Sequence, residues 1–145
     1  MIKIAHESPK GVFEEVQKLT DYDYALVHLF EEDEEYLNQF KRARDKGREI
    51  ILDNSIFELE EAFDAVKFDK WVKDFRPSWY IVPDALEDAT KTCDQMEDWN
   101  NKGLGYEGSG KIGVVQGKTY DEIVDCYNYM NKSADVDMIA ISFDY

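Results

Sequence analysis

Residues 49–63 read "EIILDNSIFELEEAF", and the change of character inside this stretch indicates the fold. The apolar run 50–52 ends abruptly at the polar residues 53–55, and amphipathic sequence follows. An apolar strand that passes through a short polar turn into a helix is the repeating unit of a parallel α/β sheet. Ser55 and Glu58 also fit the capping box that starts a helix, so the polar turn has a structural interpretation as well as a functional one.

Apolar segments of this kind recur along the chain and predict further strands. With the run before Asp53 included, six strands are expected, over residues 2–6, 24–30, 49–52, 78–83, 111–115 and 136–142. The segments between them carry apolar residues at helical spacing, as in the helix expected over 88–101. Ser8 is expected to cap the first helix, and Thr119 with Glu122 forms a capping box for the last one.

Strands that are apolar throughout are buried on both faces, which is typical of a parallel sheet covered by helices. We therefore predict a single α/β domain over residues 1–145, a (β/α)8 TIM-barrel-like fold that is incomplete with six βα units. The alternative is an open doubly wound parallel sheet. Six strands leave a barrel with two free sheet edges, so we expect a truncated barrel, or one completed by a partner or a second copy of the chain.

The acidic composition limits the partners. The chain has 32 acidic and 17 basic residues and a net charge of −15, which repels phosphate backbones and argues against a nucleic-acid groove over much of the surface. Residues 40–48 are locally basic and are expected to form the solvated face of a helix. No apolar run approaches the roughly 20 residues that span a bilayer, and the N-terminus lacks a secretory signal. We expect a soluble cytoplasmic protein with no membrane partner.

Polar residues follow the expected strands. Because the carboxyl ends of parallel strands meet at one rim of an α/β fold, we expect these residues to lie close together. The candidates are His6, Glu7, His28, Asp53, Asn54, Ser55, Asp84, Gln116, Gly117, Ser142 and Asp144. Some have a structural interpretation too: Asp84 with Glu87 fits a helix cap, Gly117 fits a turn, and His28 fits a buried core histidine.

A metal centre is one alternative at this rim. His6, His28 and Asp53, with Glu7 and Asp84, offer nitrogen and oxygen ligands as in metal-dependent hydrolase or phosphoesterase barrels. However, the first strand offers "AHES" rather than two histidines flanking one residue, and no histidine follows the last three strands. The preferred hypothesis therefore includes no metal and no cofactor. A third alternative is an acidic, non-catalytic binding protein that mimics DNA.

Three segments that follow the third, fourth and fifth expected strands resemble motifs of one family. These are "ILDNSIFE", "VPDALED" and "GVVQGK", and they are similar to motifs of the tRNA-guanine (queuine/archaeosine) transglycosylase superfamily. Members of that superfamily are TIM barrels that exchange a guanine for a deazaguanine base, and phage-type relatives act on DNA. Asp53 and Phe57 match the first motif, Asp84 the second, and Gln116 with Gly117 the third.

The resemblance implies a glycosyltransferase, specifically a pentosyltransferase, and a role for each matched residue. Asp53 is the expected acid/base at the base, and Asp84 and Gln116 are expected to hydrogen-bond the base edge. A carboxylate suits N–H donors, and an amide suits a carbonyl oxygen. The other substrate-binding residues expected are Phe57, Gly117, His6 and His28. The implied partners are a purine-like or deazapurine base and a nucleic acid, tRNA or DNA, bound through a local site, in the host cytoplasm if the protein is phage-encoded.

The chain also departs from the family pattern. Ile56 and Glu58 stand in place of a glycine and a glutamine, and the sixth strand leads into "ISFDY" instead of a glycine-rich pocket wall. The nucleophilic aspartate and the Cys/His zinc site of the family lie beyond the sixth strand, where this sequence stops. We therefore expect the 145-residue chain to be inactive alone as a transglycosylase.

Overall fold

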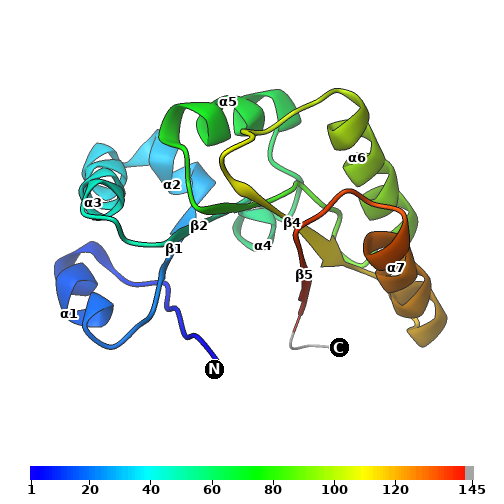
Figure 1. Cartoon of the computed structure of the whole chain (residues 1–145), viewed down its shortest axis with the longest axis horizontal. Coiled ribbons are helices and arrows are strands. Elements are labelled where there is room, and N and C mark those ends of the chain that lie inside the picture. The colour runs from blue at the N-terminus through cyan, green and yellow to red at the C-terminus, as the bar shows by residue number, and fades with distance from the viewer. Residues whose placement is uncertain (143–145) are drawn as a thin grey trace.

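The computed structural model describes residues 1–142, and its central feature is a parallel sheet (Figure 1). Within these residues the sheet has five strands: β1 (Asp23–Leu26), β2 (Ile50–Asp53), β3 (Trp79–Ile81), β4 (Gly110–Val115) and β5 (Met138–Ile141). Each strand pairs in parallel with the next one in the sequence, so the order is β1-β2-β3-β4-β5 without reversal. The predicted α/β class with a parallel sheet is confirmed, and Asp144 lies outside the described residues.

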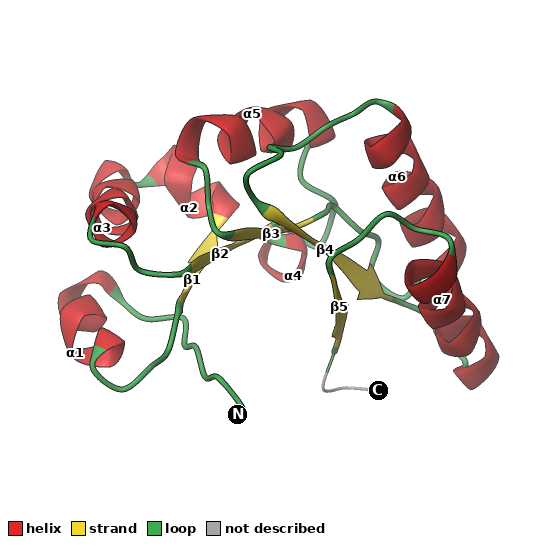
Figure 2. Cartoon of the chain, viewed as in Figure 1, coloured by secondary structure: helices red, strands yellow, loops and turns green. Residues whose placement is uncertain are grey.

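One helix precedes β1, and the others connect successive strands. They are α1 (Phe13–Gln17), which follows a 3-10 turn at Lys10–Val12, then α2 (Val27–Glu32), α3 (Glu34–Asp45), α4 (Ile56–Leu59), α5 (Ala65–Phe75), α6 (Ala89–Asn101) and α7 (Tyr120–Lys132). Figure 2 shows the long helices α3, α5, α6 and α7 arranged around one side of the curved sheet. This arrangement leaves the carboxyl ends of the strands to the loops and short helices.

Aromatic side chains fill the core between the helices and the sheet. The ring of Phe30 in α2 lies 4.9 Å from that of Phe75 in α5, centroid to centroid, and 5.9 Å from that of Phe40 in α3. On the other side of α5, the ring of Trp99 in α6 lies 5.8 Å from that of Tyr80 in β3. All these rings are buried, so the apolar residues that recur at helical spacing face the sheet as expected.

The prediction of a strand over residues 2–6 is wrong. Residues 1–142 therefore contain five strands of the βα pattern instead of six. The segment 2–6 has no regular secondary structure, and Ile2 is 89% exposed. Its backbone contact with the chain before β1 is local: Ile4 N donates to Asp21 Oδ2 (2.7 Å), and Ile4 O accepts from Asp21 N (2.7 Å). Two alternating isoleucines resemble a strand in sequence, but a strand also needs an apolar surface to cover, and none buries them.

Two predictions about the later helices are confirmed. Helix α6 occupies Ala89–Asn101, as the spacing over 88–101 predicts. Thr119 and Glu122 form the capping box of α7, since each side chain accepts a hydrogen bond from the backbone N–H of the other. The local sequence decides these helix starts because the donors and acceptors lie within one turn.

Three other capping predictions are wrong. The first turn begins after Pro9 with no side-chain cap, so Ser8 is not its N-cap. Ser55 has a positive φ of 62° and makes no cap hydrogen bond, so it does not form a capping box with Glu58. Helix α6 starts later than Asp84, because Asp88 accepts from Lys91 N at 2.9 Å and acts as the N-cap. Asp84 and Ser55 are therefore committed to tertiary contacts.

We expect Gly117→Ala to destabilise the protein. A Cβ at Gly117 would lie 2.9 Å from the backbone nitrogen of Ile123, at the start of α7, so the helix would have to shift. The expected cost is about 1–3 kcal/mol in the free energy of unfolding, measured by urea denaturation. Gly11→Ala is the control, since nothing lies within 4 Å of its Cβ position, and equal effects of the two substitutions would contradict the close approach of α7.

Candidate functional site

The carboxyl ends of β2, β3 and β4 are joined by a buried polar network. Asn54 Nδ2 donates to Asp84 Oδ1 at 2.7 Å, and Gln116 Nε2 donates to Asp84 Oδ2 at 2.7 Å. All three residues are buried, and Asp84 is only 2% exposed. The structure therefore brings Asp84 and Gln116 together as the sequence predicts, and Asn54, which was expected at the rim without a binding role, joins them.

Backbone groups hold both amides of this network in a fixed orientation. Asn54 Oδ1 accepts from Ile56 N (3.0 Å), and Asn54 Nδ2 also donates to Val82 O (3.0 Å). Gln116 Oε1 accepts from Glu87 N at 3.0 Å. Each amide therefore presents its NH₂ group to Asp84. Burial raises the pKa of the Asp84 carboxyl, and the hydrogen bonds from Gln116 and Asn54 oppose this rise.

Asp53 lies beside this network and has separate partners. Its Oδ1 accepts from Ser55 N at 2.5 Å, and its Oδ2 accepts from the Tyr24 hydroxyl. Asp53 is partly buried, and this burial raises its pKa to about 6, against the lowering effect of the two hydrogen bonds. Glu58 and Asp84 raise the pKa further by charge repulsion. A carboxyl with this pKa exchanges its proton near neutral pH.

Tyr24 is a residue of the site that the sequence analysis missed, and the strand register accounts for its position. Leu26 of β1 is paired with Asp53 of β2, and Tyr24 lies two residues before Leu26 on the same face of the sheet. Burial, followed by the charge of Asp53, raises the pKa of the Tyr24 hydroxyl, so it remains a protonated donor. The sequence does show that Tyr24 and Leu26 share one face of the strand. It does not show that Leu26 pairs with Asp53, and without this register the contact between Tyr24 and Asp53 could not be predicted.

The other predicted site residues do not all lie at the rim of the sheet. His28 lies in α2 instead of a strand, because β1 ends at Leu26. Its backbone N–H donates to Ser55 Oγ at 3.3 Å, and its Nδ1 is buried without a hydrogen-bond partner in residues 1–142. His6 is exposed in the irregular N-terminal segment, and Phe57 is 62% exposed in α4.

The N-terminal segment nevertheless approaches the site through Glu7. Burial, followed by the charge of Glu58, raises the pKa of the Glu7 carboxyl, and the nearby His28 opposes this rise. Gly117 is buried against the start of α7, where it allows close packing, so its position is explained by the fold. The carboxyl rim therefore contains Asp53, Asp84 and Gln116, with His28 linked to it through Ser55.

The metal hypothesis requires several of these side chains to converge. Within residues 1–142, no group of three or more histidines, cysteines, aspartates or glutamates is arranged to hold a metal ion. His6 is exposed in the N-terminal segment, and Asp84 is turned toward Asn54 and Gln116.

Among the helices of residues 1–142, none is both long enough and apolar enough to cross a membrane.

Comparison with known proteins gives no match among protein-family models, curated proteins or solved structures. The resemblance to the transglycosylase motifs therefore depends on the quoted residues alone, and the geometry of the site carries the functional argument.

We expect Asp84→Ala to destabilise the protein by about 2–4 kcal/mol, because both buried amides that donate to Asp84 lose an acceptor. The measurement is the free energy of unfolding in urea. Asp94→Ala, which removes an exposed carboxylate from α6, is the matched control and should change stability by less than about 0.5 kcal/mol. Similar values for the two variants would show that the network contributes little.

The pKa of Asp53 predicts a specific pH dependence. Its folded-state pKa of about 6 exceeds the ordinary value of 3.8, so between these pH values the folded protein retains a proton that the unfolded chain has released. The free energy of unfolding therefore falls as the pH rises through this window. The Asp53→Asn variant has no carboxyl to titrate, so it keeps its stability as the pH rises. The free energy of unfolding of the variant minus that of the wild type should therefore increase by on the order of 2–3 kcal/mol across the window. Urea denaturation at several pH values measures the difference, and parallel curves would contradict the assigned pKa.

Proposed function

We propose that the chain is a transglycosylase-like α/β domain that binds a guanine- or deazaguanine-type base at the carboxyl ends of β2, β3 and β4. The observation that carries this proposal is the position of Asp53, a partly buried carboxyl with a pKa of about 6, at the same rim as the buried pair of Asp84 and Gln116. This combines an acid/base group with a hydrogen-bonding group, as base exchange at a glycosidic bond requires.

The chemistry of Asp84 and Gln116 supports recognition of a purine-like edge. Each carboxylate oxygen of Asp84 accepts one hydrogen bond from a protein amide and has a further lone pair. A guanine-type base presents N–H donors beside a carbonyl oxygen, which a carboxylate and an amide complement. Because Asp84 is 2% exposed, base binding requires the surrounding residues to open locally.

Asp53 supplies the proton in the proposed reaction. When the bond between the sugar carbon and the base nitrogen breaks, the departing base takes the electron pair and receives a proton from Asp53. In this proposal a nucleophilic carboxylate on the strands that complete the barrel forms the new bond to the sugar carbon, and the incoming base later displaces it. A pKa of about 6 suits this role, since both protonation states are populated near neutral pH. The Tyr24 hydroxyl and the Ser55 N–H orient the carboxyl.

The strand order supports an interrupted barrel as the scaffold. Sequential parallel strands with helices on one side are the arrangement from which a (β/α)8 barrel is built. In this proposal further strands, from a longer chain or a second copy, complete the barrel beyond β1 and β5. The edge strand β5 leaves Met138 and Ile141 exposed, which supports such an extension.

The nucleic acid substrate, tRNA or DNA, would reach the rim through a local site, because the net charge of −15 disfavours a broad interface.

The test is the binding of guanine, with adenine as the comparison ligand, measured by thermal shift and calorimetry. Guanine should stabilise the wild-type protein, and adenine should not, since it lacks the N–H and carbonyl pattern of the guanine edge. Asp84→Asn replaces an acceptor oxygen by a donor while keeping the size of the side chain. It should weaken guanine binding about tenfold or more, because a donor then faces a donor.

Asp94→Asn makes the same charge change on the exposed face of α6 and should bind guanine like the wild type. The melting temperature of each variant without ligand shows whether it is folded. Equal stabilisation by guanine and adenine, or none by guanine, would contradict the proposed base site.

A further inference from the structure

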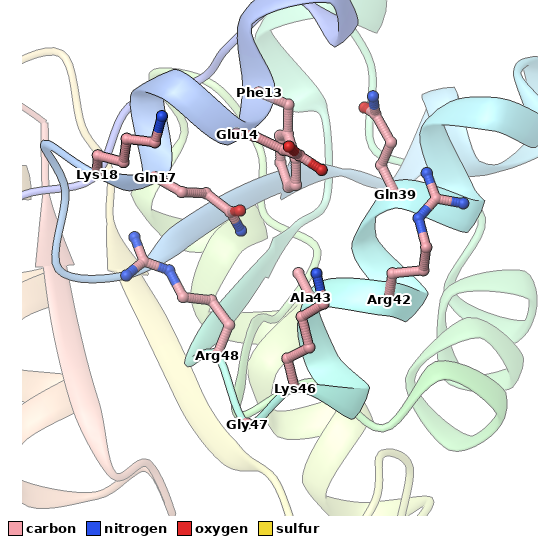
Figure 3. A pocket seen from close by; sticks show the side chains of 10 residues that line it. All are labelled: Phe13, Glu14, Gln17, Lys18, Gln39, Arg42, Ala43, Lys46, Gly47 and Arg48. Atoms are coloured by element: carbon pink, nitrogen blue, oxygen red, sulfur yellow. The ribbon is translucent and has the colours of Figure 1, made fainter.

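A second site lies at the other end of β2, in a pocket between α1 and α3. The pocket has a volume of about 410 Å³, within the range of small-molecule sites, and Figure 3 shows the side chains around it. The residues that line it are Phe13, Glu14, Gln17, Lys18, Gln39, Arg42, Ala43, Lys46, Gly47 and Arg48. Arg48 precedes β2 and Asp53 ends it, so the pocket and the rim are separated by on the order of 15 Å of extended chain.

The charge of this pocket is opposite to that of the protein. Four lysine and arginine side chains and one glutamate, Glu14, line it, in a chain with 32 acidic and 17 basic residues. The side chains of Arg42 and Lys46 make no hydrogen bond or ion pair within residues 1–142, and the two residues are joined only through the backbone, where Lys46 N donates to Arg42 O at 3.1 Å. Both residues are exposed at α3, as the expected solvated helix face requires, and they also line one cavity (Figure 3).

Buried groups hold a third cation in place. Arg48 Nε donates to Asp23 Oδ1 at 3.0 Å, and Arg48 Nη2 donates to the backbone oxygen of Thr20 at 2.7 Å. Asp23 is buried and also accepts from Gln17 Nε2 at 2.6 Å, so one carboxylate positions two side chains of the pocket wall. The Arg48 guanidinium is therefore oriented before any ligand arrives, which lowers the entropy cost of binding.

The rest of the wall offers apolar surface and acceptors. Phe13 and Ala43 are buried and contribute apolar surface. Gln39 Nε2 donates to Lys10 O at 3.0 Å, and Gln39 Oε1 is buried without a hydrogen-bond partner in residues 1–142. Together with Glu14, this acceptor suits hydroxyl or N–H donors. A matching ligand therefore carries a compact anionic group beside polar donors.

We propose that this pocket binds a small phosphate monoester, such as a sugar phosphate or a nucleoside monophosphate. The phosphate lies among Arg42, Lys46 and Arg48, and the hydroxyl groups of the ligand face Gln39 and Glu14. Arginine and lysine form charge-assisted hydrogen bonds to phosphate oxygens. The acidic charge of the remaining surface repels a long polyanion more strongly than a small ligand, which favours a free phosphate monoester over a nucleic acid strand.

Calorimetry in a buffer without phosphate tests the proposal with adenosine 5′-monophosphate, ribose 5-phosphate, adenosine and a single-stranded oligonucleotide. Adenine-containing probes separate this pocket from the guanine-type rim site. Both phosphate monoesters should bind, and adenosine should not. Arg42→Gln and Lys46→Gln should each weaken binding of the monophosphate about tenfold, since each removes a charge-assisted contact.

Lys41→Gln is the matched control, because Lys41 neighbours Arg42 on α3 but does not line the pocket, and it should change the affinity less than about twofold. Four results would overturn the proposal: no binding of either monoester, equal binding of adenosine, equal weakening by Lys41→Gln, or tighter binding per phosphate by the oligonucleotide. The last result would assign the cations to a nucleic-acid contact.

Discussion

The buried carboxylate of Asp84 is the constraint on which the functional end of the sheet depends. A carboxylate removed from water is costly unless donors compensate it, and here Asn54 and Gln116 provide two hydrogen bonds. These donors come from the ends of β2 and β4, so the charge of one residue fixes the relative positions of three strand ends. Asp53, at the last position of β2, is therefore held close to Asp84.

The sequence predicted the parts of the fold whose causes are local or fully apolar. The mostly apolar runs at 50–52 and 111–115 became strands, in which buried residues occur beside partly buried ones. The capping box of Thr119 satisfied its own helix start. The run at 2–6 failed because its burial depends on a neighbouring surface that the sequence does not describe. The rim position of Asp84 and Gln116 was predictable because the strand ends of a parallel sheet converge.

The contacts that the sequence did not reveal depend on tertiary geometry. Asn54 was expected at the rim without a role of its own, and its side chain binds Asp84 there. Tyr24 reaches Asp53 only because the register places Leu26 opposite Asp53. Ser55 shows how such contacts override local preference: its hydroxyl accepts from the backbone of His28 instead of capping α4. The two ends of β2 also differ in charge, with carboxyls at one end and the cations around Arg48 at the other.

The central claim is that Asp53, Asp84 and Gln116 act as one base-binding unit. Carbon NMR of the side-chain carboxyl and amide carbons tests it most directly, recorded from about pH 2 to about pH 8 with and without guanine. We expect the Asp53 carboxyl to titrate at about pH 6 and the signals of Asp53, Asp84 and the Gln116 amide to shift together when guanine is added. An Asp53 carboxyl that titrates near its ordinary value of 3.8, or rim signals that guanine leaves unchanged, would contradict the account.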